Sequence, residues 1–299
     1  MTSFSIPLAT PIRHDLALRY FNRSPDEILD LVRAERHYRV LPNATEPLLI
    51  EISAPREQLN GALTARVLSG VAEEAAVRAA VLRLYQPAPN GVAHIHDEPL
   101  AVQLTESFKG LPVLQTLTPW EALVWAILGQ QITIGFAYRL KRAFTEQFGE
   151  RVVHDGQSYF ALPTPERVAE LDHERDLRPL QFSRQKSRYI IEAARSVLSG
   201  ELDFDAIATL DDEAARAALQ RQLGVGRWTA EYVLLRGFGR LDVIPAGDVA
   251  LRMIVGKYLQ LGRHASEEEV RELAERWRPR RGEIGFLLWF AKQSGWFRK

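Results

Sequence analysis

The chain has 299 residues, 46% of them hydrophobic and 25% charged, which is ordinary for a globular protein and excludes disordered, collagen-like and coiled-coil chains. It contains no cysteine, which excludes disulfides, thiolate metal sites and a cysteine nucleophile. Its 38 basic and 38 acidic residues cancel, so the bulk charge indicates no partner. The longest apolar run, Ala122 to Leu128, is too short for a membrane span, and no secretory signal is recognisable. We therefore expect a cytoplasmic protein without a membrane partner.

The first part of the chain is predicted to be rich in β-strands. Residues 38–41 and 48–52 hold aliphatic and β-branched side chains and lie between prolines. Residues 71–85 have the composition of a helix, and a turn-rich stretch follows at 86–91. We predict a small N-terminal antiparallel β-sheet domain with helices over residues 1–115.

The rest of the chain reads as one helix after another. The run Thr118 to Glu121 has a threonine for the N-cap, proline at the first helical position and glutamate at the third, which predicts a capping box. Residues 184–199 form a further helix that ends at Gly200, and a second capping box stands at 266–269. The predicted fold class is therefore α+β, with an all-α domain over residues 116–299.

The segment Leu223 to Tyr232 joins two predicted helices through a Gly-Val-Gly sequence. Gly224 and Gly226 let the backbone turn tightly and approach a partner with no side chain in the way. The free amides at the start of the second helix favour a phosphate. We predict a helix–hairpin–helix over 214–238 that grips DNA, in which an alanine at Gly226 would obstruct the phosphate and penalise a positive φ. An ordinary turn between helices is the alternative.

Asp248 follows Gly226 by 22 residues and stands behind a Pro-x-Gly turn, at the predicted start of a new helix. Aspartate is a good N-cap, which is the structural interpretation of this residue. A carboxylate also stabilises the oxocarbenium-like transition state of glycosidic bond cleavage and can activate water. One side chain can serve both purposes.

Hairpin, second helix, loop and Asp248 together resemble the helix–hairpin–helix (HhH-GPD) DNA glycosylase superfamily, in particular its bacterial 3-methyladenine DNA glycosylase II (AlkA-type) branch. The similarity covers about residues 115–295 and includes the sequences AILGQQIT at 126–133 and AERWRP at 274–279. It implies a monofunctional glycosylase of base excision repair with Asp248 as the catalytic residue. Such an enzyme flips alkylated purines, such as 3-methyladenine, 7-methylguanine and ethenoadenine, out of double-stranded DNA and hydrolyses their bonds, leaving an abasic site.

The resemblance also implies a pocket for the flipped base. It places Trp228, Tyr232 and Trp289 there, where aromatic faces would stack on a cationic base, although ordinary core packing is the alternative. Tyr20 and Phe21 could close the pocket from the N-terminal domain, without any local signal for this.

Further residues are expected to contact DNA. Gln130 and Gln131 stand where the family inserts a wedge into the gap left by the base, and a solvated polar turn is the alternative. Relatives often carry leucine at the Gln131 position, and glutamine could hydrogen-bond the orphaned base instead. The hairpin adds four predicted contacts: Gly224, Gly226, Arg227 and Thr229. Two basic runs without acids, 178–188 and 276–281, fit either phosphate contact or solvated helix faces.

Several absences narrow the expectation. Trp228 occupies the place of the lysine that bifunctional relatives use as a nucleophile, so no lyase step is expected. No metal site is expected, because His94 and His96 have no third ligand. No cofactor is expected either, apart from a monovalent cation that hairpin carbonyls of residues 220, 222 and 224 can hold.

We expect a monomer that acts at the nucleoid on double-stranded DNA containing damaged bases. Two alternatives stay open: a non-catalytic helix–hairpin–helix protein that binds DNA structure, and a monofunctional glycosylase for deaminated or etheno-adducted purines.

Overall fold

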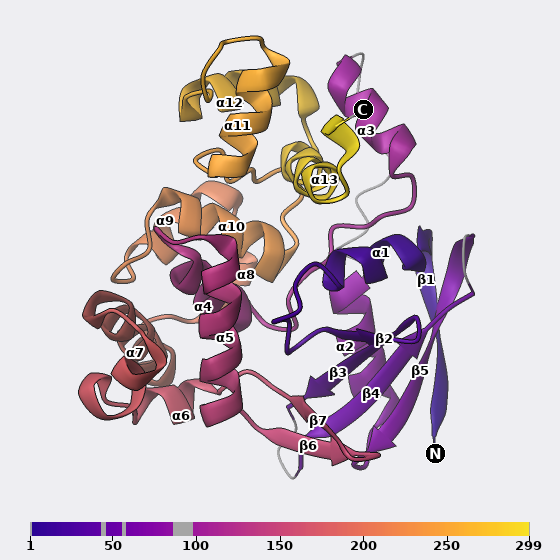
Figure 1. Ribbon diagram of the computed structural model, residues 1–299, viewed down its shortest axis with the longest axis vertical. Coiled ribbons are helices and arrows are strands. Elements are labelled where there is room, and N and C mark those ends of the chain that lie inside the picture. The colour runs from indigo at the N-terminus through magenta and orange to yellow at the C-terminus, as the bar shows by residue number, and fades with distance from the viewer. Residues whose placement is uncertain (1, 43–45, 56–57, 86–97, 299) are drawn as a thin grey trace.

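The computed structural model describes residues 2–42, 46–55, 58–85 and 98–298. Within these residues the N-terminal half holds a five-stranded antiparallel sheet in the order β1-β5-β4-β3-β2 (Figure 1). Its strands are β1 (Ser3–Arg13), β2 (Leu31–Arg33), β3 (Arg36–Leu41), β4 (Leu48–Ser53) and β5 (Leu59–Ser69). Two helices, α1 (His14–Phe21) and α2 (Glu74–Tyr85), pack their apolar side chains into the same core as the sheet.

The two predicted strands are confirmed as parts of β3 and β4, and the predicted helix is confirmed as α2. Sequence analysis missed β1, although it is eleven residues long. Pro7 and Pro11 interrupt the strand pattern in the sequence, because proline is rare within strands. The pairing of β1 with β5 also shifts register between Pro7 and Ile12. Because β1 lies at the edge of the sheet, it tolerates residues that cannot donate a ladder hydrogen bond.

From residue 98 onward the described chain is mostly helical, and the predicted α+β fold class is confirmed. The helices of this part are α3 (Pro99–Ser107), α4 (Pro119–Gly129), α5 (Ile134–Phe148), α6 (Pro165–Ala169), α7 (Arg184–Ser199), α8 (Phe204–Thr209), α9 (Asp212–Gln220), α10 (Arg227–Phe238), α11 (Val249–Tyr258), α12 (Glu267–Ala274) and α13 (Arg281–Gln293). Four short helical turns accompany them: η1 (His173–Leu177), η2 (Arg178–Leu180), η3 (Glu275–Trp277) and η4 (Trp296–Arg298). A hairpin of β6 (Arg151–His154) and β7 (Gln157–Phe160) is an addition that the sequence did not indicate. Helix α3 precedes the predicted domain boundary at residue 116, which stays a prediction.

Helix ends follow the sequence signals with one exception. Helix α7 ends at Gly200 in a left-handed conformation, and both hydrogen bonds of the capping box at Ser266 are present. At the start of α4, Thr118 accepts the bond from the Glu121 amide, but the predicted capping box is wrong in its second half. The Glu121 carboxylate turns instead to the Leu117 amide and to the buried guanidinium of Arg39, which offers a stronger, charge-assisted bond.

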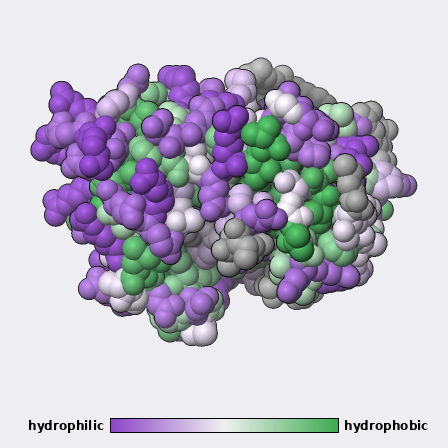
Figure 2. Space-filling view, turned by 90° about the horizontal axis from the view of Figure 1, so that it is seen from below, coloured by the Kyte–Doolittle hydropathy of each residue, from purple (hydrophilic) through white to green (hydrophobic). Residues whose placement is uncertain are grey.

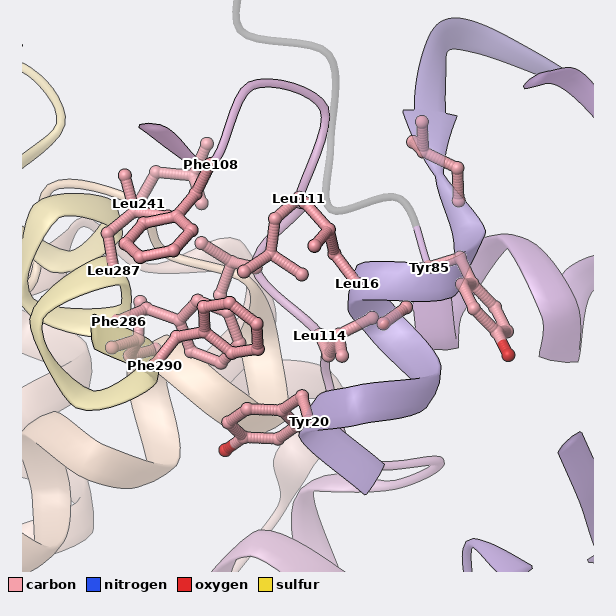
Figure 3. Packing of buried hydrophobic residues seen from close by; sticks show 14 of the residues in the cluster. Leu16, Tyr20, Tyr85, Phe108, Leu111, Leu114, Leu241, Phe286, Leu287 and Phe290 are labelled. Atoms are coloured by element: carbon pink, nitrogen blue, oxygen red, sulfur yellow. The ribbon is translucent and has the colours of Figure 1, made fainter. Parts of the chain in front are cut away.

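The two halves share buried contacts. Tyr20 of α1 lies with its ring centre 4.8 Å from that of Phe286 on α13, and Figure 3 shows it pointing toward the side that carries Phe286 and Phe290. Lys141 of α5 forms a buried ion pair with Glu27 at 2.6 Å. Seen from below, the surface alternates polar and apolar patches (Figure 2). No helix of the described residues has the length and apolar character that a membrane crossing requires.

Candidate active site

The hairpin between α9 and α10 has its tight turn at Gly224. This residue has φ +81°, and a Cβ there would lie 2.3 Å from a ring atom of Tyr189. Gly226 is the N-cap of α10 with φ −82°, and a Cβ there would meet nothing within 4 Å. The expected positive φ at Gly226 is therefore wrong, because the left-handed step falls two residues earlier. Gly226 instead leaves the exposed start of α10 open to a ligand.

A groove runs between the hairpin, the turn that joins α4 to α5, and the start of α7. It has a volume of about 1010 Å³. Every residue that the sequence assigned to DNA contact lines it, together with Trp228: Gln130, Gln131, Gly224, Gly226, Arg227 and Thr229.

The turn after α4 is fastened to the hairpin. The Gln130 side chain donates through Nε2 to the Gly224 carbonyl and to Thr229 Oγ1, at 3.0 Å each. Gln131 is exposed and has φ +57°, so it projects from the turn. Thr229 is buried and its hydroxyl accepts the bond from Gln130, while the residue still lines the groove, so its contact with DNA stays a prediction.

The positive charge of Arg227, the arginine of the hairpin, is partly neutralised by a neighbouring carboxylate. Arg227 is half-exposed, and its Nε donates to Glu231 at 3.0 Å. Glu231 also pairs with Arg271 at 2.8 Å. The backbone amides at the start of α10 are therefore a more available anion ligand here than the paired Arg227 guanidinium.

Most of the basic side chains in the two runs are paired or buried, whereas Arg188 and Arg276 are exposed. Arg178 and Arg184 both pair with Glu174, and Lys186 is buried. In the second run, Arg278 and Arg281 both reach Asp242 at 3.0 Å. The choice between phosphate contact and solvated helix faces therefore stays open, although several of these charges already have a carboxylate partner.

Asp248 is the N-cap of α11. Its amide closes the predicted turn by donating to the Pro245 carbonyl at 2.9 Å. Its Oδ1 accepts from the amides of Ala250 (2.9 Å) and Leu251 (3.1 Å) and from Trp289 Nε1 (3.0 Å). Among the described residues no donor reaches Oδ2. One carboxylate oxygen is thus held by three donors, and the other has no donor among the described residues.

The three predicted pocket aromatics lie in a row beside Asp248. The ring centres of Trp228 and Tyr232 are 5.7 Å apart, and those of Tyr232 and Trp289 are 5.9 Å apart. Tyr232 is buried, whereas the two tryptophans are half-buried. Burial raises the pKa of Tyr232 to about 12, so it keeps its proton. The structure brings together all four residues that the sequence assigned to the pocket and the catalytic step.

A small enclosed cavity adjoins this row. Tyr20, Phe21 and Tyr232 line it, so the suggested aromatic pair of the N-terminal domain shares a cavity with one of the three pocket aromatics. That this pair closes the pocket stays a prediction. Arg23 and Arg236 also line it, and Arg236 donates to the Tyr20 hydroxyl. Sequence analysis missed both arginines, because nothing local distinguishes them from surface arginines.

The carbonyls of the hairpin are the predicted site of a monovalent cation. The Gly224 carbonyl accepts from Gln130, and the Gln222 carbonyl accepts from the Val225 amide at 3.1 Å. Each oxygen keeps a lone pair, so these carbonyls fit a monovalent cation, which stays a prediction. His94 and His96 lie outside the described residues. The described residues contain no cluster of three or more side chains suited to a metal ion.

Comparison with known proteins gives a consistent result. Residues 124–279 match the model of the HhH-GPD superfamily base excision DNA repair protein. The DNA-3-methyladenine glycosylase of Bacillus subtilis is 34% identical over 192 residues, which cover 64% of this chain and 63% of that protein. DNA-3-methyladenine glycosylase 2 of Escherichia coli is 31% identical over 62% of each chain. The chain thus matches less than two thirds of the length of either relative.

A solved structure extends the likeness to the whole fold. The 3-methyladenine DNA glycosylase of Archaeoglobus fulgidus superposes with a TM-score of 0.80 at 24% identity, covering 97% of this chain and 98% of that one. The resemblance inferred from the hairpin and Asp248 is confirmed. This chain belongs to the HhH-GPD superfamily of base excision DNA repair proteins.

Proposed function

We propose that the protein is a monofunctional DNA glycosylase that releases alkylated purines, above all 3-methyladenine and 7-methylguanine, and leaves an abasic site. The observation that carries this is the Asp248 carboxylate, whose Oδ1 is saturated while Oδ2 stays free beside a row of aromatic rings. In the proposed reaction Oδ2 stabilises the positive charge that develops on the sugar and orients the attacking water.

The substrate class follows from what the site lacks. Glu267, whose carboxylate lies beside Gly247, is ion-paired with Arg271 at 2.6 Å and is already engaged by that cation. A base that alkylation has made cationic departs as a neutral molecule and needs no proton donor. Trp228 and Trp289 offer half-buried faces on which a flipped cationic base can stack.

The partner in this proposal is double-stranded DNA containing damaged bases, bound by the protein as a monomer at the nucleoid in the cytoplasm. The hairpin amides around Gly226 hold a phosphate, and Gln131 enters the gap that the flipped base leaves. A monovalent cation on the carbonyls of residues 220, 222 and 224 would add positive charge behind those amides.

The test is to incubate the protein with methylated duplex DNA and to measure the released bases by chromatography. Release of 3-methyladenine and 7-methylguanine supports the proposal. Release of hypoxanthine or ethenoadenine alone favours the alternative substrate class. If micromolar protein releases no base but binds the duplex, the chain is a binding module.

Borohydride trapping tests the monofunctional part. Lys141 is ion-paired with Glu27 and Lys186 donates to backbone carbonyls, so neither is a free nucleophile. We therefore expect no trapped covalent adduct with damaged DNA. A robust adduct would contradict the absence of a lyase step.

A further inference from the structure

Lys186 is a buried lysine that the proposed reaction does not use. It lies in the first turn of α7 with 8% of its surface exposed. Its Nζ donates to the carbonyls of Ile127 at 2.9 Å and of Gln130 at 2.6 Å. Ile127 lies in the last turn of α4 and Gln130 is its C-cap, so both carbonyls stand at the negative end of the helix dipole, where they remain open to a further donor. The Ile127 carbonyl also accepts from the Gln130 amide at 3.3 Å. An ammonium group supplies both a donor and a positive charge.

The turn that these carbonyls begin is strained. Gln131 has φ +57°, a left-handed conformation that is unfavourable for a non-glycine residue and persists only where the surroundings hold it. Two anchors hold this turn. The Gln130 side chain ties it to the hairpin at Gly224, and Lys186 ties its backbone to α7.

No other role competes for the lysine. Among the described residues no carboxylate lies within ion-pair distance of its Nζ. Burial alone lowers the pKa of Lys186 to about 8, so the group is charged at neutral pH. Lys186 lines the groove but is only 8% exposed, and its Nζ is engaged by the carbonyls of Ile127 and Gln130. The charge is therefore directed at the two carbonyls.

We propose that Lys186 is a positioning residue that sets the direction in which Gln131 enters the duplex when a base is flipped. The inference rests on the proposed function, because it assigns the turn to a wedge. Lys186 does not touch DNA in this account. Lys186 fixes the position of the C-terminal end of α4. Because Gln131 comes directly after that end, its backbone direction is fixed as well.

The experiment uses a duplex with a tetrahydrofuran abasic analogue opposite 2-aminopurine, whose fluorescence reports the stacking of the orphaned base without any chemistry. At saturating protein, Lys186→Met and Gln131→Ala should both lose most of the fluorescence change that the wild type produces. Lys186→Arg should keep it, since it retains the charge and the donors. Lys109→Met removes an exposed lysine and serves as the control, which should behave as the wild type.

Base release provides the second readout. With 7-methylguanine paired to cytosine, Lys186→Met should slow single-turnover release by about 10-fold, the equivalent of ~1.4 kcal/mol. The double variant Lys186→Met/Gln131→Ala should be no slower than Gln131→Ala, because both changes remove one function. With the lesion opposite tetrahydrofuran there is no orphaned base, and the loss should fall below about 3-fold.

The outcomes separate the two proposals. If the wild type releases no base but the fluorescence pattern holds, the proposed function fails and the positioning role stands. If Lys186→Met gives the wild-type fluorescence change, or the double variant multiplies the two losses, the positioning role is refuted. Should Lys186→Met not fold, Lys186→Gln keeps one neutral donor and must give an intermediate fluorescence change.

Discussion

Replacing Asp248 by asparagine tests the roles of its two carboxylate oxygens separately. Asparagine keeps an acceptor at the Oδ1 position, so the bonds from Ala250, Leu251 and Trp289 can persist. It turns Oδ2 into an amide group and removes the negative charge. A unit charge about 4 Å from the sugar cation is worth about 4 kcal/mol at an effective dielectric of ~20. Because Asp248 is only half-buried, water screens part of this. We expect base release to fall at least ~100-fold, about 2.7 kcal/mol.

Stability should change little in the same variant. Asparagine caps helices about as well as aspartate, and the lost interaction with the helix dipole is worth about 0.3–1 kcal/mol. The assay is single-turnover release of 7-methylguanine together with a thermal melt. Asp203→Asn is the matched control, because Asp203 caps α8 by accepting from the amides two and three residues on, as Asp248 does. If Asp248→Asn keeps more than a tenth of the activity while its Tm falls, the residue is structural and the catalytic role is refuted.

Three further predictions follow from the geometry. Gly226→Ala should weaken the binding of damaged and of undamaged duplex equally, measured at one fixed salt concentration. Gly224→Ala should instead lower the Tm, because Gly224 has a positive φ and its new Cβ would meet the ring of Tyr189. If Gly226→Ala and wild type bind the undamaged duplex with equal affinity, the hairpin amides do not hold a phosphate. Trp289→Phe keeps an aromatic face but loses the bond to Asp248, and release should slow about 10-fold; an unchanged rate would mean that the bond is dispensable. Burial lowers the pKa of His14 to about 4, so stability should fall by up to roughly 3 kcal/mol as the pH drops from 6.5 toward 4, because only the unfolded chain takes up the proton. The check is the urea midpoint of wild type and of His14→Gln between pH 6.5 and 4. If the midpoint falls equally in both proteins, His14 is not the cause of the acid sensitivity.

Local signals in the sequence carried much of the fold and the centre of the site. The end of α7 at Gly200, the capping box at Ser266 and the N-cap at Asp248 each depend on a few neighbouring residues, and the chain shows them directly. The contacts that assemble the site are different in kind. Trp289 bonds a residue 41 positions away, and Arg236 bonds the hydroxyl of Tyr20 across 216. Such partners are decided by how whole helices pack, which no local pattern in one sequence records.

The apolar core passes without a break from the sheet half to the helical half. One cluster of buried side chains includes Ile6 and Leu63 of the sheet, Tyr20 of α1, and Phe286 and Phe290 of α13. Figure 3 shows the last three of these side chains. Because neither half has all of this core to itself, unfolding of the sheet exposes apolar surface on the helices as well. A destabilising substitution in β1 or β5 should therefore reduce the folded population of the entire chain. Variants of the sheet would then show themselves as lower protein abundance in the cell, with an unaltered choice of lesion in the molecules that remain folded.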